Sequence, residues 1–287
     1  MLNWDREYRV VAGVPGSEGF EIGAKGESGR ALRVHFSCEK TNTMASNSGR
    51  LQIWNLNDAH RSILKSKGCV VELSAGYGSV LAPIFVGDVS NPKESLDSAD
   101  TVIEVDLFDG RLTFEKTVTL AYNGETMCQT VLTDVATAMG IASVTYTPEA
   151  QKTLATAKYY LGYSFAGKGR DAISAVCKMC GLKWTLQNGV LQIYASGDAI
   201  TSKGYVLSAS TGLVSIPSKV KISIDGKDYA GYEVEYFLNG SIGVNDLVVL
   251  ESKNVNGTYW VYKQTYEGDN YNGDWVCKAQ LLEVKAK

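Results

Sequence analysis

The sequence is poor in histidine, in excess basic charge and in long apolar runs, and each shortage argues against a class of function. Only His35 and His60 occur among 287 residues, so a Ser-His-Asp or Cys-His site would have to use one of them. No G-x-S-x-G nucleophile motif is present. The formal net charge is -3, and nothing marks the chain as a binder of the nucleic-acid backbone. We therefore expect no enzyme activity and no sequence-specific nucleic-acid binding.

Membrane and secretion signals are also missing. No apolar run approaches the roughly 20 residues of a membrane-spanning helix, so we expect no membrane span. Residues Met1 to Glu7 contain neither a basic nor an apolar signal region, which predicts a protein that is not secreted. Several of the six cysteines stand in apolar runs, as small buried hydrophobic residues do. We expect free thiols and assembly in a reducing cytoplasm.

Two stretches contain residue types that can bind a metal ion. Cys177 and Cys180 form a CxxC pair at the C-terminal end of a predicted helix. Zinc would need a second ligand pair, and a redox pair is usually found at a helix N-terminus, so packing is the favoured interpretation. The segment from Asp269 to Asp274 is similar to half of a calcium loop but lacks the closing glutamate, which favours a turn. We predict no metal and no cofactor.

The first part of the chain, residues 1–110, has the pattern of a small antiparallel β-barrel. Hydrophobic content of 45%, with 29 glycines and 16 tyrosines, is typical of a folded, β-rich protein with many turns. Period-2 runs predict strands, and Asn55 to Leu64 predicts a short helix with Asn or Asp as its cap. The predicted strands cover residues 32–38, 51–54, 69–74, 84–86 and 102–108.

Composition changes in residues 111–200, where we predict an α+β insert. Residues 112–120 read as a strand, and the apolar spacing over 125–139 predicts a helix that ends at Gly140. Residues 158–194 predict a strand, a helix over 170–180 and a hairpin that turns at Asn188-Gly189.

Residues 201–287 contain five strand patterns and predict a second small barrel. The expected fold is therefore mainly β with an α+β insert. Two small antiparallel β-barrels would flank a helical segment and a strand-helix-hairpin domain.

This order of elements resembles the phage tail baseplate hub proteins. The first region carries the resemblance through Leu51-Gln52-Ile53-Trp54-Asn55-Leu56, Arg61, Lys67-Gly68, Val71-Glu72-Leu73 with Ala75-Gly76-Tyr77, and Ile84 to Val89. The insert adds Gly162, Ser164, Phe165, Gly167, Ala172, Gly181, Leu182, Trp184, Gly189, Leu191 and Ile193. The last region adds the turn pattern Gly268-Asp269, Gly273 and Trp275.

The resemblance implies a structural protein of the virion that forms a homotrimer. Two similar barrels per subunit would give the ring approximate sixfold symmetry and leave a channel for DNA. The expected partners are the tail tube or a distal tube-adaptor protein, the central spike or tip protein and other baseplate proteins. Exposed aromatic residues would lie between subunits, and the candidates are Tyr8, Trp54, Tyr77, Tyr236 and Trp260. Two alternatives stay open: the hub of a tailocin or type VI-like injection machine, and a glycan-binding or cell-wall-degrading tail protein.

Overall fold

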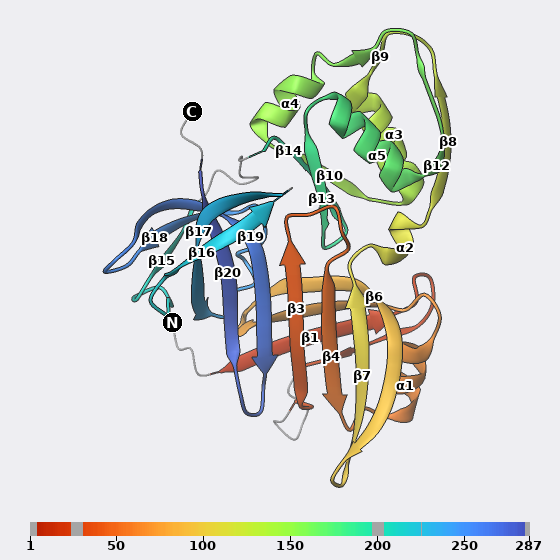
Figure 1. Ribbon diagram of the computed structural model, residues 1–287. Coiled ribbons are helices and arrows are strands. Elements are labelled where there is room, and N and C mark those ends of the chain that lie inside the picture. Colours follow the sequence, from red (N-terminus) through yellow and green to blue (C-terminus); the bar gives the residue numbers. More distant parts are fainter. Residues whose placement is uncertain (1–4, 24–30, 197–203, 225, 285–287) are drawn as a thin grey trace.

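The alternating sequence patterns fold into two β regions with an α+β insert above them (Figure 1). The computed structural model describes residues 5–23, 31–196, 204–224 and 226–284. The first region contains β1 (Arg6–Gly13), β2 (Gly19–Ile22), β3 (Val34–Thr41), β4 (Ser48–Trp54), α1 (Asp58–Lys65), β5 (Val70–Tyr77), β6 (Val80–Asp97) and β7 (Asp100–Phe108). The second contains β15 (Gly204–Ser208), β16 (Ser218–Ile224), β17 (Lys227–Phe237), β18 (Leu247–Glu251), β19 (Asn256–Asp269) and β20 (Trp275–Glu283).

Strand β19 joins the two β regions. Its first residues, 256–260, pair with β18 of its own region, while residues 263–269 pair antiparallel with β3 of the first region. Its opposite edge pairs with β20, and the register shifts between Val261 and Lys263. The bulge accompanies the change of partner, so that one long strand pairs first with β18 and then with β3 along the same edge. One 13-stranded sheet results, with the order β16-β17-β20-β19-β3-β4-β7-β6-β5-β1-β2 and with β15 and β18 branching from β19.

The mainly β fold with an α+β insert is confirmed. The two separately closed barrels are not formed by the described strands, because the sheet order runs from β16 to β2 without its ends meeting. The division into residues 1–110, 111–200 and 201–287 stays a prediction. None of the helices formed by the described residues is long and apolar enough to cross a lipid bilayer.

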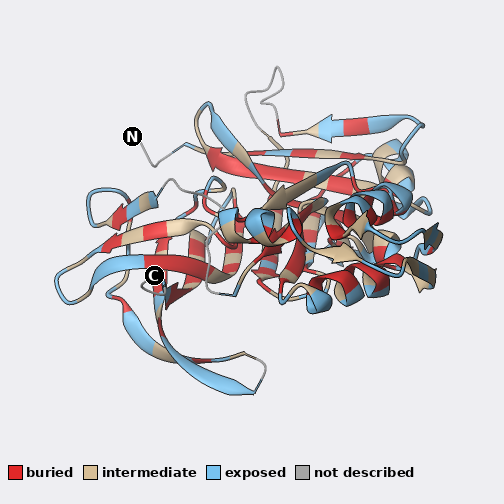
Figure 2. Ribbon diagram, turned by 90° about the horizontal axis from the view of Figure 1, so that it is seen from above, coloured by how far each residue is buried: buried red, intermediate tan, exposed pale blue. Residues whose placement is uncertain are grey.

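Buried side chains form one core shared by both β regions and a separate core in the insert (Figure 2). The shared core contains Tyr8 and Phe36 from the first region and Tyr236 and Tyr266 from the second. Trp184 is the largest side chain in the insert core. The outer part of the β16–β17 hairpin extends from the body with most residues exposed.

The insert contains three short sheets and four helices among its described residues. Its elements are α2 (Arg111–Phe114), β8 (Thr117–Tyr122), β9 (Thr126–Met127), α3 (Cys128–Met139), β10 (Ser143–Tyr146), α4 (Pro148–Leu154), β11 (Lys158–Tyr159), β12 (Tyr163–Lys168), α5 (Gly169–Met179), β13 (Lys183–Gln187) and β14 (Val190–Tyr194). The helices of 125–139 and 170–180 and the hairpin at Asn188 are confirmed within a few residues. The strand predicted for 112–120 was wrong at its start, because residues 111–114 form the turn of α2 that leads into the insert.

Gly268 gives a test of how tightly β19 packs beside β3. A Cβ atom at this position would lie 2.3 Å from the Phe36 ring and 2.7 Å from the Trp275 ring. Gly268→Ala should lower the free energy of unfolding by about 1–3 kcal/mol, because the crowded rings must move. Gly243→Ala is the matched control, since its nearest neighbour would lie at 3.6 Å. Equal denaturant midpoints for the two variants would contradict this packing.

Candidate functional site

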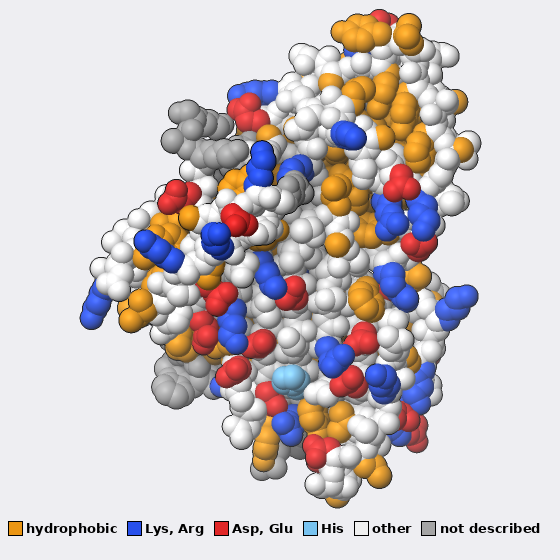
Figure 3. Space-filling view, viewed as in Figure 1, with side chains coloured by type: hydrophobic (Ala, Val, Ile, Leu, Met, Phe, Trp, Pro, Cys, Tyr) orange, Lys and Arg blue, Asp and Glu red, His pale blue; other side chains and the backbone are white. Residues whose placement is uncertain are grey.

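A continuous polar surface is formed by the outward side of six neighbouring strands, β17, β20, β19, β3, β4 and β7. We call it the polar face. Cys38, Tyr266 and Cys277 alternate with outward residues along their strands and point into the core. Because successive side chains of a strand point to opposite sides, Ser37, Glu267 and Val276 lie together outside. In Figure 3 charged side chains are spread across this part of the molecule, whereas hydrophobic ones gather on the insert.

Carboxylates outnumber cations on the polar face. Over the paired residues of these strands, its seven carboxylates are Glu39, Glu104, Asp106, Glu233, Glu235, Glu267 and Asp269, and its three cations are Arg50, Lys263 and Lys278. Each cation has a carboxylate partner across a strand pair. Lys263 lies 2.7 Å from Glu39, Lys278 lies 2.8 Å from Glu267, and Arg50 lies 3.3 Å from Asp106. The face therefore presents a net negative surface whose cations are already engaged.

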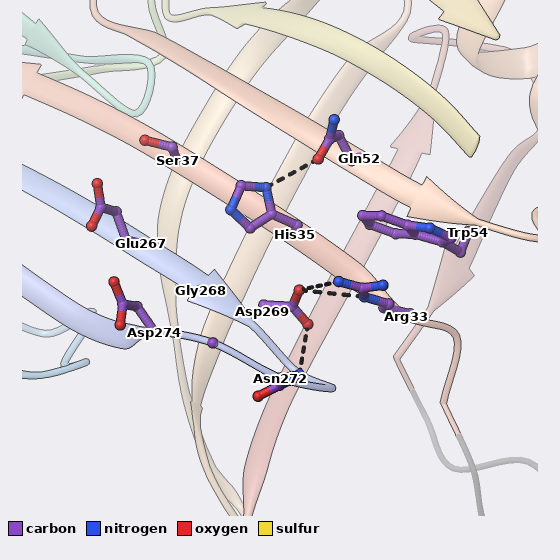
Figure 4. A pocket seen from close by; sticks show the side chains of 11 residues that line it. Arg33, His35, Ser37, Gln52, Trp54, Glu267, Gly268, Asp269, Asn272 and Asp274 are labelled. Carbon is purple, nitrogen blue, oxygen red and sulfur yellow. Dashed lines mark hydrogen bonds and ion pairs between the residues drawn. The ribbon is translucent and has the colours of Figure 1, made fainter. Parts of the chain in front are cut away.

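A hollow of about 620 Å³ lies at the end of the polar face beside the β19–β20 turn (Figure 4). Arg33 forms one wall, with its guanidinium 4.2 Å from the Trp54 ring centre and 5.6 Å from that of Tyr271. It donates a hydrogen bond of 2.8 Å to the Asp269 carboxylate. His35 points toward Gln52, with 3.1 Å between its Nδ1 and the amide oxygen. Two pairs of polar groups in the hollow, Arg33 with Asp269 and His35 with Gln52, are thus bonded to each other.

Asp269 organises the turn between β19 and β20. Its Oδ1 accepts backbone N–H bonds from Tyr271 at 2.8 Å and Asn272 at 3.1 Å. Burial opposes ionisation of this carboxyl, but the Arg33 and backbone hydrogen bonds prevail and lower its pKa below the usual value. Arg6 also donates to the backbone oxygens of Asp269 and Gly273. The Asp269 to Asp274 stretch is therefore a hydrogen-bonded turn. Across the described residues, no three His, Cys, Asp or Glu side chains cluster as metal ligands.

The two cysteines of the CxxC pair pack in the insert. Cys177 is buried against the core, and burial raises the pKa of its thiol to about 12. Cys180 is partly exposed, and its thiol pKa is also raised by burial. Since the thiolate is the reactive form of cysteine, both shifts disfavour redox chemistry and agree with the packing interpretation.

The five aromatic residues predicted at subunit contacts occupy different places. Tyr8 and Tyr236 are not exposed as expected, because both lie in the shared core, where the Tyr236 hydroxyl donates to Gln264. Trp54 and Trp260 project from opposite ends of the polar face and are mostly buried by their own chain. Tyr77 is half-buried and its ring meets Phe237. A role in subunit contacts stays a prediction for all five.

Sequence reasoning did not single out the residues of the polar face. The signal was available, because His35, Ser37 and Glu39 alternate with the apolar residues of β3. Alternation shows which residues share a side of a strand, but it does not show which strands adjoin. The pairing of β3 with β19, over more than two hundred residues of sequence, was needed to assemble the surface.

Solved structures with the same fold include phage tail and secretion-system proteins. A 43 kDa tail protein of prophage MuSo2 from Shewanella oneidensis superposes with a TM-score of 0.64 at 10% identity, covering 97% of this chain and 98% of that one. A tail protein from Neisseria meningitidis gives 0.61 at 11% identity, covering 96% and 97%. A type VI secretion component of Escherichia coli, described as similar to bacteriophage T4 tail proteins, gives 0.58 at 11% identity, covering 88% and 74%.

These similarities confirm the predicted resemblance to phage tail baseplate hub proteins at the level of the fold. No protein-family model matches the sequence, and no curated protein matches it.

Asp269→Asn should destabilise the turn beside the hollow. The amide keeps the size of the side chain but loses the charge-assisted bonds from Arg33, at a cost of about 1.5–3 kcal/mol near neutral pH. Because the folded-state pKa of Asp269 is lowered, this contribution is present above the unfolded-state pKa and is lost as pH falls through the folded-state value. The difference between Asp269→Asn and wild type should therefore shrink in acid.

Chemical unfolding at several pH values measures that difference. The control is Asp274→Asn in the same turn, whose exposed side chain should change stability by less than about 0.5 kcal/mol. A gap between Asp269→Asn and wild type that persists unchanged below the folded-state pKa would show that the carboxylate charge is not responsible.

Proposed function

We propose that the chain is a structural protein of a phage tail baseplate, located in the virion and assembled in the host cytoplasm. Three copies would form a hub with approximate sixfold symmetry that joins the tail tube, or a distal tube-adaptor protein, to the central spike or tip protein. Other baseplate proteins would surround it. The observation that carries the proposal is the edge-to-edge joining of two β regions into one sheet with a negatively charged outer face.

The shared sheet suits a ring in which each subunit fills two places. Because β19 pairs with both β18 and β3, the two β regions are held side by side within one chain. Three such chains would supply six β regions, matching a sixfold tube. Closed rings are built from heterologous contacts, in which different surfaces of neighbouring subunits meet.

The polar face suits the lining of a channel for DNA. Its excess carboxylates would repel the phosphate backbone, and its cations are held by carboxylates of neighbouring strands. A surface that binds DNA usually carries uncompensated lysine and arginine, since phosphate contacts dominate affinity. We infer that DNA would pass this surface without being retained.

A non-enzymatic role agrees with the hollow beside the polar face. Arg33 is committed to Asp269, and His35 to Gln52. These bonds occupy the histidine and the arginine of the hollow, two groups that an acid–base site would need to present to a substrate.

The hub of a tailocin or type VI-like machine is the second candidate. It is favoured by the similarity of the fold to the E. coli secretion component. The genes that neighbour the coding sequence would distinguish the two, since a phage tail operon encodes a capsid nearby and a secretion system does not.

Mass in solution and particle imaging test the hub directly. Light scattering should give three times the 31.1 kDa of one chain, either for the isolated protein or after mixing with tube and spike proteins. Imaging of intact particles with imposed threefold symmetry should place the chain between tube and spike. A monomer that never enters a tail would overturn the proposal.

Charge reversal on the polar face tests the channel. Glu233→Lys with Glu235→Lys should make the assembled ring bind duplex DNA at about 50 mM salt and release it by about 200 mM, because the new lysines contact phosphates. An electrophoretic shift assay measures this.

The matched control changes Glu18 and Asp171 to lysine. Both are exposed carboxylates away from the polar face, and the net charge changes equally. Equal DNA binding by both double variants would show that overall charge, and not the polar face, controls DNA retention.

A further inference from the structure

The turn of the β13–β14 hairpin is inserted into the β body at a point rich in buried polar groups. Asn188 and Gly189 form this turn with positive φ angles of 51° and 75°, as an Asn-Gly hairpin requires. Hairpin turns normally project into water, but this turn forms hydrogen bonds with Lys40 on β3, Val86 on β6 and Asp109 at the end of the first region.

Asn188 connects two buried charges of opposite sign. Its side-chain oxygen accepts hydrogen bonds from the Lys40 ammonium and from the Val86 backbone N–H, the latter at 3.0 Å. Its own backbone N–H donates to Asp109 Oδ2 at 2.6 Å, and that of Gly189 donates to Oδ1 at 3.1 Å. Lys40 is 4% exposed and Asp109 1%, so both charged groups are shielded from water. Asn188 itself is half-buried, and Gly189 at the tip of the turn is exposed.

Further polar contacts surround this turn. Asn47 donates to the backbone oxygen of Leu186 at 3.0 Å, Gln187 donates to that of Thr41 at 2.9 Å, and Thr185 donates to that of Thr43 at 2.8 Å. The contact between the β13–β14 hairpin and the β body thus contains many directional hydrogen bonds. The two cores on either side of this contact are apolar.

Burial opposes the charged forms of both groups at this junction. Burial lowers the pKa of Lys40 to about 8 despite the attraction of Asp109. Burial also raises the pKa of Asp109 despite Lys40 and the hydrogen bonds that it accepts. In other proteins, replacing a buried ion pair by apolar residues of similar volume is often neutral or stabilising. The presence of buried charged groups at this position is explained if their hydrogen bonds favour one placement of the insert on the β body over others.

We propose that Lys40, Asp109 and Asn188 form a latch that fixes the orientation of the α+β insert on the β body. The insert is then a separately folded module that moves relative to the body once the latch is removed. The latch does not depend on the proposed hub function, since it concerns contacts within one chain.

Asn188→Gly is the sharpest test. Glycine keeps the positive φ angle of the turn, but it removes the oxygen that Lys40 and Val86 require. Amide hydrogen exchange should accelerate by about tenfold or more at residues 40–47, 84–87 and 185–190, because local opening becomes easier. The cores of α3 and α5 and of the β regions should keep their protection.

Asn91→Gly is the matched control. Asn91 also has a positive φ angle, of 49°, and its side chain makes only an exposed hydrogen bond to Asp106 among those of the described residues. This variant should leave exchange at the hairpin unchanged. If Asn188→Gly also leaves exchange at the hairpin unchanged, the latch is refuted. If the insert and the β body lose protection together in Asn188→Gly, the insert is not a separately folded module.

Lys40→Met with Asp109→Leu separates orientation from stability. Lys40→Met alone should strongly lower the denaturant midpoint, because Asp109 is left buried without its counter-charge. The double variant should recover the midpoint to the wild-type value or above, yet show a larger radius of gyration in solution scattering as the insert moves. A double variant with wild-type dimensions and hairpin protection would overturn the latch.

Discussion

The architecture depends on one strand that has two partners on the same edge. β19 is 14 residues long, and the register shift after Val261 divides it into a segment paired with β18 and a segment paired with β3. Without the second pairing, the β regions would be independent units with exposed strand edges, which tend to aggregate. With it, they share a sheet and a core. Arg6 of β1 donates hydrogen bonds to backbone oxygens of the β19–β20 turn, and these bonds also link the first β region to the second.

The shared sheet also determines which polar residues become neighbours. Lys263 and Glu39 are more than two hundred residues apart in sequence, yet their side chains lie 2.7 Å apart across the joined strands. Single exposed ion pairs add little stability, so their main effect is on the electrostatic field of the surface. The cations are engaged and carboxylates remain in excess. That balance disfavours the retention of a polyanion on the polar face, because no uncompensated cations are left among its described residues to contact it.

Much of the buried polarity in the described residues lies where the insert meets the β body. The apolar cores would hold each module together, but apolar contacts are not directional and would tolerate several placements of the insert. Asn47, Gln187 and Asn188 accept or donate bonds that exist in one placement only. The same physical logic operates at Asp269, where a carboxylate buried beside Arg33 selects one conformation of a turn.

Local patterns in the sequence determined the strands, the helices near α3 and α5, the Asn188-Gly189 turn and the overall resemblance to tail hub proteins. Periodicity and turn chemistry act over a few residues, so they can be read directly from the chain. The pairing of β3 with β19, the polar face and the burial of Lys40 beside Asn188 were decided only by the tertiary structure. Each depends on which distant segments come together, and alternation within a strand contains no information about that choice.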